Sequence, residues 1–397
     1  MTSAVPTRAA SARAHTANPP PWRDIRVIAW VFQLVVIALV VLVIARLWSN
    51  YQDNTRAINV PSNFDFLDQP ANFPIAGSSF RQTQPVRDAI IEGLFNTLRL
   101  AVTGIILATI LGTLLGIARL SQNFIVRKAA QLYVEFVRNV PLFCILILMY
   151  TAVVLGALPD PRGGGSWVLG PVAVLNTRGI SLFWFEGANT KFVVVLLAAA
   201  LAFVVTAYVR RRRSERTGTA ARSGLWGIGA AVAVGAVVWL VLSLGVTKPE
   251  LSGLRVNGGI SMSAPYAASL LALVIYTSSH IAEIVRGSIQ AVPKGQGEAA
   301  NALALSGFQR MWYVVLPQAM RIGVPAIGNQ FLNLAKNSSL AAAISFPELT
   351  AIIGLTVANR SPAVPSYTLL LLTYLALSLA LSAVVNLVNR RLAVVER

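Results

Sequence analysis

Long apolar stretches recur along the whole chain and dominate its hydrophobic pattern. A helix needs roughly 20 apolar residues to cross about 30 Å of hydrocarbon. Stretches of about this length lie at 25–47, 95–118, 135–157, 191–209, 225–246, 264–285, 321–343 and 366–388. The pattern therefore predicts an all-α, polytopic membrane helical bundle with about eight transmembrane helices.

The segments around these stretches predict the outer parts of the chain. Residues 1–24 are rich in Ala, Ser, Pro and Arg and should form a disordered cytoplasmic tail. The stretch 25–47 is too long for a signal-peptide core, and no small-residue cleavage site follows it, so we expect a retained N-terminal transmembrane helix. We expect an extracytoplasmic loop at 48–94, irregular chain at about 158–190, where Gly and Pro are dense, and a cytoplasmic tail at 391–397.

The composition agrees with a membrane protein. The chain is 55% hydrophobic and 12% charged, whereas soluble domains are about a quarter charged. A net charge of +18 could indicate nucleic-acid binding, but no water-facing segment is large enough to carry a basic domain, so we expect no nucleic-acid partner. One cysteine, Cys144, excludes an intrachain disulfide, and with only His15 and His280 a Cys/His metal site is excluded.

The positive charge carries information about topology. With the N-terminus placed in the cytoplasm, more than half of the 33 basic residues fall in segments on the cytoplasmic side. Both termini are therefore expected in the cytoplasm. The arginine run 210–213 fits an anchor that stops translocation, and a patch for lipid headgroups or a partner is the alternative.

The segment after the sixth apolar stretch is neither loop-like nor apolar enough for a membrane. Gly295 to Gly297 offer a helix start, Glu298 falls in the first turn, where the helix dipole favours a negative charge, and an Ala/Leu run follows. Small side chains allow another surface to approach closely. We interpret this segment as a short cytoplasmic docking helix.

These residues also carry a family resemblance. Glu298-Ala299-Ala300, followed by Leu316-Pro317, resembles the EAA loop of ABC importer permeases, whose coupling helix fits a cleft of the ATPase subunit. The flanking Glu283, Arg286-Gly287 and Pro293-Lys294-Gly295 are similar to the polar amino-acid branch. The resemblance implies a set of ATPase-coupling residues: Gly295, Glu298, Ala299, Ala300, Ala302, Leu303 and Ala304.

The resemblance covers 95–156 and 264–390, which are therefore expected to be the two parts of an ABC permease core. The remaining length lies in the N-terminal span and in an insertion at 157–263 with two extra transmembrane helices. This long form resembles permeases of general L-amino-acid transporters and of glutamate, glutamine, aspartate and asparagine transporters.

Two departures from the family pattern carry predictions. Ala304 stands where the family usually has glycine, so the turn there is expected to continue as helix. Asn337 stands where the family usually has an aspartate, which removes an acid. An amide offers a donor and an acceptor without net charge, so neutral or acidic amino acids should be accepted at least as well as cationic ones.

Polar residues within the spans are the candidates for a substrate path, because lipid-facing polar groups are costly. Gln330, Asn333 and Asn337 share one helical face. The full candidate set is Gln330, Asn333, Lys336, Asn337, Ser338, Thr277 and Ser278; each could instead make a helix-packing hydrogen bond.

Two pairs with a spacing of three residues are predicted as interfacial ion pairs: Glu135 with Arg138, and Glu283 with Arg286. Each is either a structural pair or a latch near the gate. His280 is expected to be a packed structural residue.

The resemblance implies a permease subunit of an amino-acid importer in the bacterial inner membrane. The chain lacks a P-loop sequence, so it should be no enzyme and bind no cofactor, while a separate ATPase dimer uses ATP and Mg. The implied partners are that dimer, a second, homologous permease subunit, a periplasmic amino-acid-binding protein and membrane lipid.

Two alternatives are an ion-coupled secondary transporter and a non-transporting scaffold with a cytoplasmic docking helix. The first would need acids within the membrane, whereas the acids of this chain cluster at span ends.

Overall fold

The computed structural model describes residues 22, 24–57, 63–185, 190–217, 223–243, 245–253, 255–359 and 361–392. The two expected tails lie almost wholly outside the described residues. Contacts divide the chain into two compact units, residues 1–63 and 64–397.

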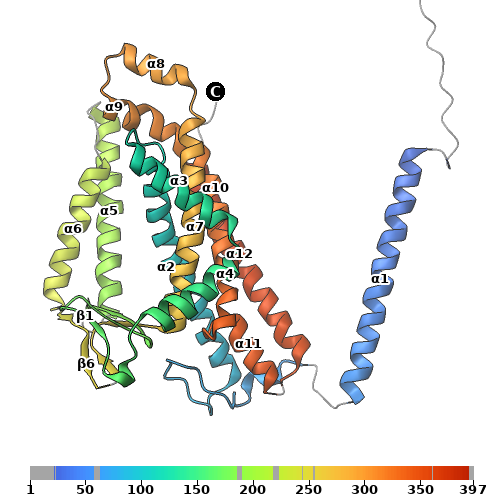
Figure 1. Ribbon diagram of the computed structural model, residues 1–397. Helices are drawn as coiled ribbons and strands as arrows, with labels where there is room; N and C mark the ends of the chain where they lie inside the picture. The colour runs from blue at the N-terminus through green and yellow to red at the C-terminus, as the bar shows by residue number, and fades with distance from the viewer. Residues whose placement is uncertain are drawn as a thin grey trace, which may run out of the picture. The chain divides into compact units, whose positions relative to one another are not determined.

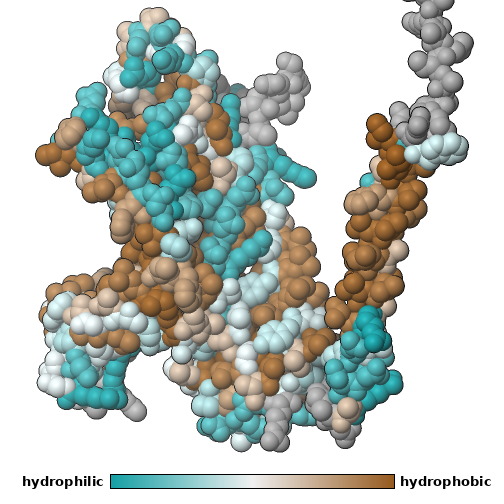
Figure 2. All heavy atoms as spheres, turned by 45° about the vertical axis from the view of Figure 1, so that its right-hand side comes forward, coloured by the Kyte–Doolittle hydropathy of each residue, from teal (hydrophilic) through white to brown (hydrophobic). Residues whose placement is uncertain are grey.

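The first unit contains one long helix, α1 (Ile25–Ala57). The face seen in Figure 2 is hydrophobic over most of the length of the helix and hydrophilic at its C-terminal end. None of the residues in its most apolar part is buried. The helix is long enough to span a membrane. It runs ten residues further than the predicted 25–47, because Ser49 to Ala57 continue the helix after the apolar stretch has ended.

The second unit is a helical bundle (Figure 1). Its main helices are α2 (Val86–Ala118), α7 (Ala264–Gln290), α10 (Leu316–Asn337) and α12 (Ala363–Leu392). Shorter pieces complete it: η1 (Asp65–Asp68), α3 (Phe124–Asn139), α4 (Leu142–Leu148), η2 (Met149–Ala157), α9 (Gly307–Arg310), η4 (Met311–Val315), η5 (Ser338–Ile344) and α11 (Leu349–Ala358). The central helix is α7, which packs against α2, α3, α4, η2 and α10.

The most extensive packing joins α2 to α7, and it depends on glycine. A Cβ atom at Gly112 would lie 2.7 Å from the side chain of Ile281 and 2.8 Å from the carbonyl oxygen of Ser278. A Cβ atom at Gly116 would lie 2.8 Å from the carbonyl oxygen of Ala282. The two backbones therefore approach more closely than any larger residue on α2 would allow.

The insertion forms short strands and a helical hairpin. A four-stranded antiparallel sheet has the order β1-β2-β3-β8, from β1 (Trp167–Leu169), β2 (Ala173–Asn176), β3 (Gly179–Leu182) and β8 (Ile260–Ser263). Two further pairs join β4 (Trp184–Phe185) to β5 (Val246–Thr247) and β6 (Glu250–Ser252) to β7 (Arg255–Asn257). The prediction of irregular chain at 158–190 is wrong, because these segments pair with one another and with strands about 80 residues away.

The hairpin consists of α5 (Thr190–Thr217) and α6 (Ser223–Val241), which pack along each other. Figure 1 shows α5 leaving the sheet at one end of the unit and reaching the other end. There the guanidinium of Arg210 lies over the ring of Trp226, 4.1 Å from its centroid.

The all-α membrane architecture is confirmed, although the count of eight spans is not. Six of the described helices are long and apolar enough to cross a membrane, or seven if the bent pair 307–344 and 349–358 is one span. The fifth predicted stretch is a shorter apolar helix, Leu225–Val241. The predicted span 135–157 begins too early, because α3 ends at Asn139 and the chain turns at Pro141, which disfavours helix in the preceding residue.

The α2–α7 contact predicts a stability difference between two glycine substitutions. Gly112→Ala should lower the free energy of unfolding by about 1–3 kcal/mol, because its methyl group overfills the contact with Ile281. Gly354→Ala is the matched control, since a Cβ atom there meets nothing within 4 Å. Thermal unfolding of the purified chain in detergent measures both; equal loss of stability in the two variants would contradict the close contact.

Candidate functional site

A short helix, α8 (Lys294–Ala302), lies where the sequence predicts a docking helix. Figure 1 shows it beyond one end of the bundle, between α7 and α9. It begins at Lys294, after Pro293, and so starts slightly earlier than the predicted Gly295 to Gly297. Glu298 consequently lies in the second turn and not in the first, where we had expected it to interact with the helix dipole.

The C-terminal end of α8 contradicts the prediction that helix continues through Ala304. The amide of Ala304 donates to the carbonyl of Asn301 (2.9 Å), and that of Leu305 donates to the carbonyl of Ala300 (3.2 Å). This is the hydrogen-bond pattern of a Schellman motif. Ala304 has φ 55°, the left-handed conformation that glycine adopts without strain. The helix therefore ends where the family's usual glycine would end it.

The surface of α8 is divided between packing and exposure. Ala300 is 2% exposed and packs within its own chain, whereas Gly295, Glu298, Ala299 and Ala302 are exposed. Leu303 is 75% exposed. Ala300 thus holds α8 in place, and the other predicted coupling residues on it form the surface that a partner could contact.

Side-chain hydrogen bonds fix α8 to the segment that follows. Arg310 donates to the side-chain oxygen of Asn301 (3.0 Å), and Gln318 donates to that of Gln296 (3.2 Å). Ser306 and Gln309 form a reciprocal capping box at the start of α9. Helix α8 is therefore tied to the N-terminal end of α10.

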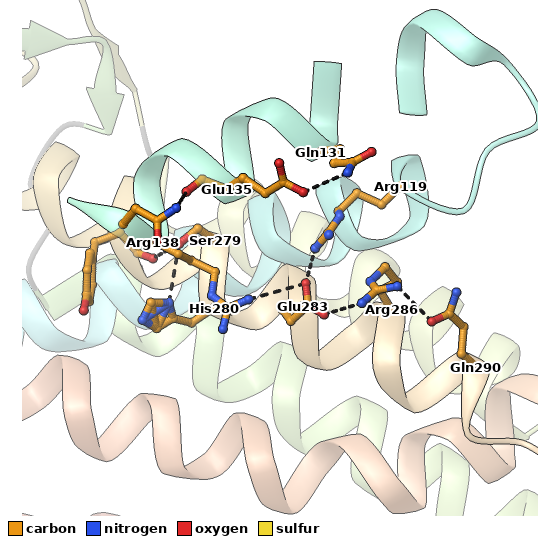
Figure 3. A network of polar contacts seen from close by, with 11 residues as sticks. Arg119, Gln131, Glu135, Arg138, Ser279, His280, Glu283, Arg286 and Gln290 are labelled. Carbon is orange, nitrogen blue, oxygen red and sulfur yellow. Dashed lines mark hydrogen bonds and ion pairs between the residues drawn. The ribbon is translucent and has the colours of Figure 1, made fainter. Parts of the chain in front are cut away.

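Figure 3 shows a charged cluster whose residues come from the C-terminal parts of α2, α3 and α7. The carboxylate of Glu283 accepts hydrogen bonds from Arg119 and Arg286. A third guanidinium, that of Arg138, lies 3.5 Å from the same carboxylate. Three cations therefore surround one acid, whose side chain is 27% exposed.

Only part of this cluster follows the predicted pairing. Glu283 does pair with Arg286, but Arg138 turns toward Glu283, and Glu135 accepts a hydrogen bond from Gln131 (2.8 Å). The predicted Glu135–Arg138 pair is therefore not made. Sequence reasoning missed Arg119; its only signal is its place directly after α2, where positive charge is expected at a cytoplasmic span end.

His280 lies next to the cluster and is packed. Its ring lies against that of Tyr276, with centroids 4.6 Å apart, and its Nδ1 is 3.5 Å from the hydroxyl of Ser279. Among the described residues, no group of three His, Cys, Asp or Glu side chains could hold a metal ion.

The predicted path residues fall on different surfaces. On α10, Asn333 and Lys336 are exposed, while Gln330 and Asn337 are partly buried. Asn337 lies in a tightly filled space between Leu142, Leu273 and neighbouring residues.

The serine and threonine candidates are buried between helices. Ser278 is fully buried and donates to the carbonyl of Ile275 (2.9 Å), and Ser338 donates to that of Ala335 (2.8 Å). Thr277 is 3% exposed. Whether any of these residues contacts substrate stays a prediction.

One acid is an exception to the expectation that acids cluster at span ends. Glu348 is fully buried at the break between η5 and α11. Its carboxylate accepts from the amide of Ala351 (2.8 Å) and from the hydroxyl of Tyr374 (2.9 Å). It caps α11 and ties it to α12, so its place in the structure accounts for its burial.

Comparison with known proteins identifies the family. Residues 103–394 match the family described as binding-protein-dependent transport system inner membrane component. The chain belongs to this family. An inner membrane component of such a system is a transporter subunit and not an enzyme, and membership favours neither the ion-coupled carrier nor the scaffold.

Several relatives match this inner membrane component over almost its whole length. It is 36% identical to YhdX of Escherichia coli (strain K12), covering 93% of this chain and 95% of the relative. It is 36% identical to the general L-amino acid transport system permease protein AapQ of Rhizobium johnstonii, covering 91% of this chain and 92% of AapQ. It is 34% identical to the glutamate/glutamine/aspartate/asparagine transport system permease protein BztB of Rhodobacter capsulatus, covering 94% of this chain and 96% of BztB.

Among solved structures, the crystal structure of an amino acid ABC transporter with histidines is similar to this chain. The TM-score is 0.46 at 20% identity, covering 77% of this chain and 94% of the other.

The charged cluster predicts unequal roles for two glutamates. Glu283→Gln should lower the free energy of unfolding by roughly 1–3 kcal/mol, because three guanidiniums lose their shared, partly buried acid. Glu135→Gln should change it by less than about 0.5 kcal/mol, because Glu135 is exposed. Thermal unfolding of both variants in the same detergent tests this, and similar midpoints would exclude a structural cluster.

The left-handed Ala304 predicts a local gain from glycine. Ala304→Gly should stabilise the end of α8 by about 1 kcal/mol, because glycine adopts this conformation without strain. Ala302→Gly, within the helix, should destabilise it by up to about 1 kcal/mol. Hydrogen exchange at the amides of 303–305 reports both, and faster exchange in Ala304→Gly would count against the strained cap.

Proposed function

We propose that this chain is one permease half of an ATP-driven amino-acid importer in the bacterial inner membrane, and that α8 couples it to an ATPase dimer. The observation that carries the proposal is α8 itself. It stands at the end of the bundle and is fixed by its C-terminal cap and by the side chains of Asn301 and Gln296. It offers exposed small and apolar side chains. A rigid helix of this kind transmits a movement of its partner to the helices behind it.

Energy comes from the partner in this proposal. ATP and Mg are used by the ATPase subunits, and this chain binds no cofactor. Movement at α8 passes along the hydrogen bond between Gln296 and Gln318 to α10, and through α7, which leads directly into α8. The cluster around Glu283 lies on this route and holds α2, α3 and α7 together, which suits a latch at the cytoplasmic gate.

A polar stripe on α10 supports a second permease subunit, homologous to this one. Asn329, Asn333 and Lys336 are spaced four and three residues apart, and all three are exposed. Such a face is costly against lipid. We therefore assign it to a translocation path enclosed between two permease halves, with Gln330 at its edge; lipid covers the apolar faces of the spans.

The substrate class rests on the relatives. AapQ is described as a general L-amino acid transport permease, and BztB as one for glutamate, glutamine, aspartate and asparagine. We propose L-amino acids, neutral and acidic or of broad range, delivered by a periplasmic amino-acid-binding protein. Both termini are then cytoplasmic, together with α8 and the basic residues near it.

The coupling role is tested by a substitution on the exposed face of α8. Ala302→Trp should leave the chain inserted in the membrane but weaken ATPase association about five- to hundredfold, because overfilling a fitted contact costs about 1–3 kcal/mol. Ala300 is unsuitable for this test, since it is buried within its own chain.

The control is Ser252→Trp, an exposed residue of β6 in the insertion. Copurification with the ATPase and substrate-stimulated ATP hydrolysis are measured for both variants and the unsubstituted chain. Normal association and hydrolysis in Ala302→Trp would overturn the coupling assignment.

A further inference from the structure

A polar cavity of about 420 Å³ lies at the end of the second unit opposite α8. Its lining comes from four parts of the chain: the loop before α2, one face of α2, the start of α7 with residues 346–347, and the strands of the insertion. This volume is within the range of small-molecule sites. The lining shares none of its residues with the candidate path on α10.

The α2 wall separates opposite charges. Glu92, Asn96 and Arg99 follow one another at spacings of four and three residues and so lie on one helical face. Glu92 and Arg99 are two turns apart, about 10 Å along the helix. Asn96 donates to the carbonyl of Pro347 (2.9 Å) between them. The α2 wall of the cavity therefore carries one anionic and one cationic side chain, about two helical turns apart.

Arg99 is held in a defined position. Its guanidinium lies over the ring of Tyr266, 4.8 Å from the centroid. Tyr266 is 4% exposed, and its hydroxyl lies 2.9 Å from that of Thr103. A guanidinium stacked on a fixed ring keeps its N–H edge available for a planar anion such as a carboxylate.

The insertion supplies a second cation. Arg178 stands at the turn between β2 and β3, where its carbonyl accepts from the amide of Ala264 at the start of α7 (2.9 Å). Asn176 accepts from the amide of Arg178 (3.0 Å), and Ser181 and Ser261 join β3 to β8 through their hydroxyls (2.9 Å). The turn is therefore fixed against the bundle and brings Arg178 to the cavity.

We propose that this cavity binds a free amino acid with a carboxylate side chain, such as glutamate or aspartate, before it enters the translocation path. The charged residues of the lining are Arg99, Arg178 and Glu92, two cations and one anion that match the two carboxylates and the ammonium group of a dicarboxylic amino acid. Glu92 receives the α-ammonium group, and the two arginines receive the carboxylates. The inference rests on the proposed function and adds an entry site formed partly by the insertion.

The test is direct binding of radiolabelled L-glutamate to the purified full chain in lipid nanodiscs. Arg99→Gln and Arg178→Gln should each weaken binding about ten- to hundredfold, because each removes a charge-assisted hydrogen bond. Arg162→Gln is the matched control: Arg162 is an exposed arginine of the same insertion that does not line the cavity. Its affinity should equal that of the unsubstituted chain.

A ligand lacking the amino group tests the role of Glu92. Glutarate should bind the unsubstituted chain more weakly than L-glutamate, and Glu92→Gln should remove this preference. Arg99→Lys keeps the charge and should recover part of the affinity lost in Arg99→Gln, which separates charge from folding. The inference is overturned if the unsubstituted chain does not bind L-glutamate. It is also overturned if Arg99→Gln, Arg178→Gln and Arg162→Gln all bind L-glutamate with equal affinity.

Two further readouts separate this inference from the proposed function. If the variants leave glutamate binding unchanged but weaken docking of the binding protein, the cavity is a protein contact and not a ligand site. If the unsubstituted chain supports ATPase association and uptake but binds no L-glutamate, the cavity inference fails alone. If the unsubstituted chain neither associates with an ATPase nor supports amino-acid uptake, the proposed function itself is rejected.

Discussion

The close approach of α2 and α7 is the constraint on which both ends of the bundle depend. Gly112 and Gly116 allow the two backbones to meet, so residues before and after this contact are brought together in pairs. Toward one end Arg119 reaches Glu283, and toward the other Arg99 stacks on Tyr266. One packing interface therefore sets the geometry of the charged cluster and of the polar cavity.

The features that could be predicted from sequence have local signals. Apolar stretches identify the spans, and each of the eight predicted stretches contains helix in the structure. The composition of 294–302 identified α8, because its glycines and the alanines that follow mark a short helix in their immediate surroundings. The basic residues near the ends of the apolar stretches could likewise be read directly from the sequence. None of these signals requires knowledge of distant residues.

The features that could not be predicted depend on distant partners. Arg119 and Glu283 are 164 residues apart, and the spacing of Glu135 and Arg138 suggested a pair that Glu283 prevents by attracting Arg138. The strands of the insertion are two to four residues long, too short for their alternation to be recognised. Ala304 has a high helix propensity, but the hydrogen bonds at the end of α8 and the capping box at Ser306 override it.

The pairing of β3 with β8 brings the two ends of the insertion close together. The insertion leaves the bundle after η2, where the carbonyl of Pro159 accepts from the amide of Thr177 (3.1 Å). It re-enters the bundle at Ala264, whose amide donates to the carbonyl of Arg178 (2.9 Å). The entropic cost of closing a segment rises only slowly with its length. A long segment between these two points therefore costs little more to close than a short one, so its length can change without altering the packing of α2, α7 and α10.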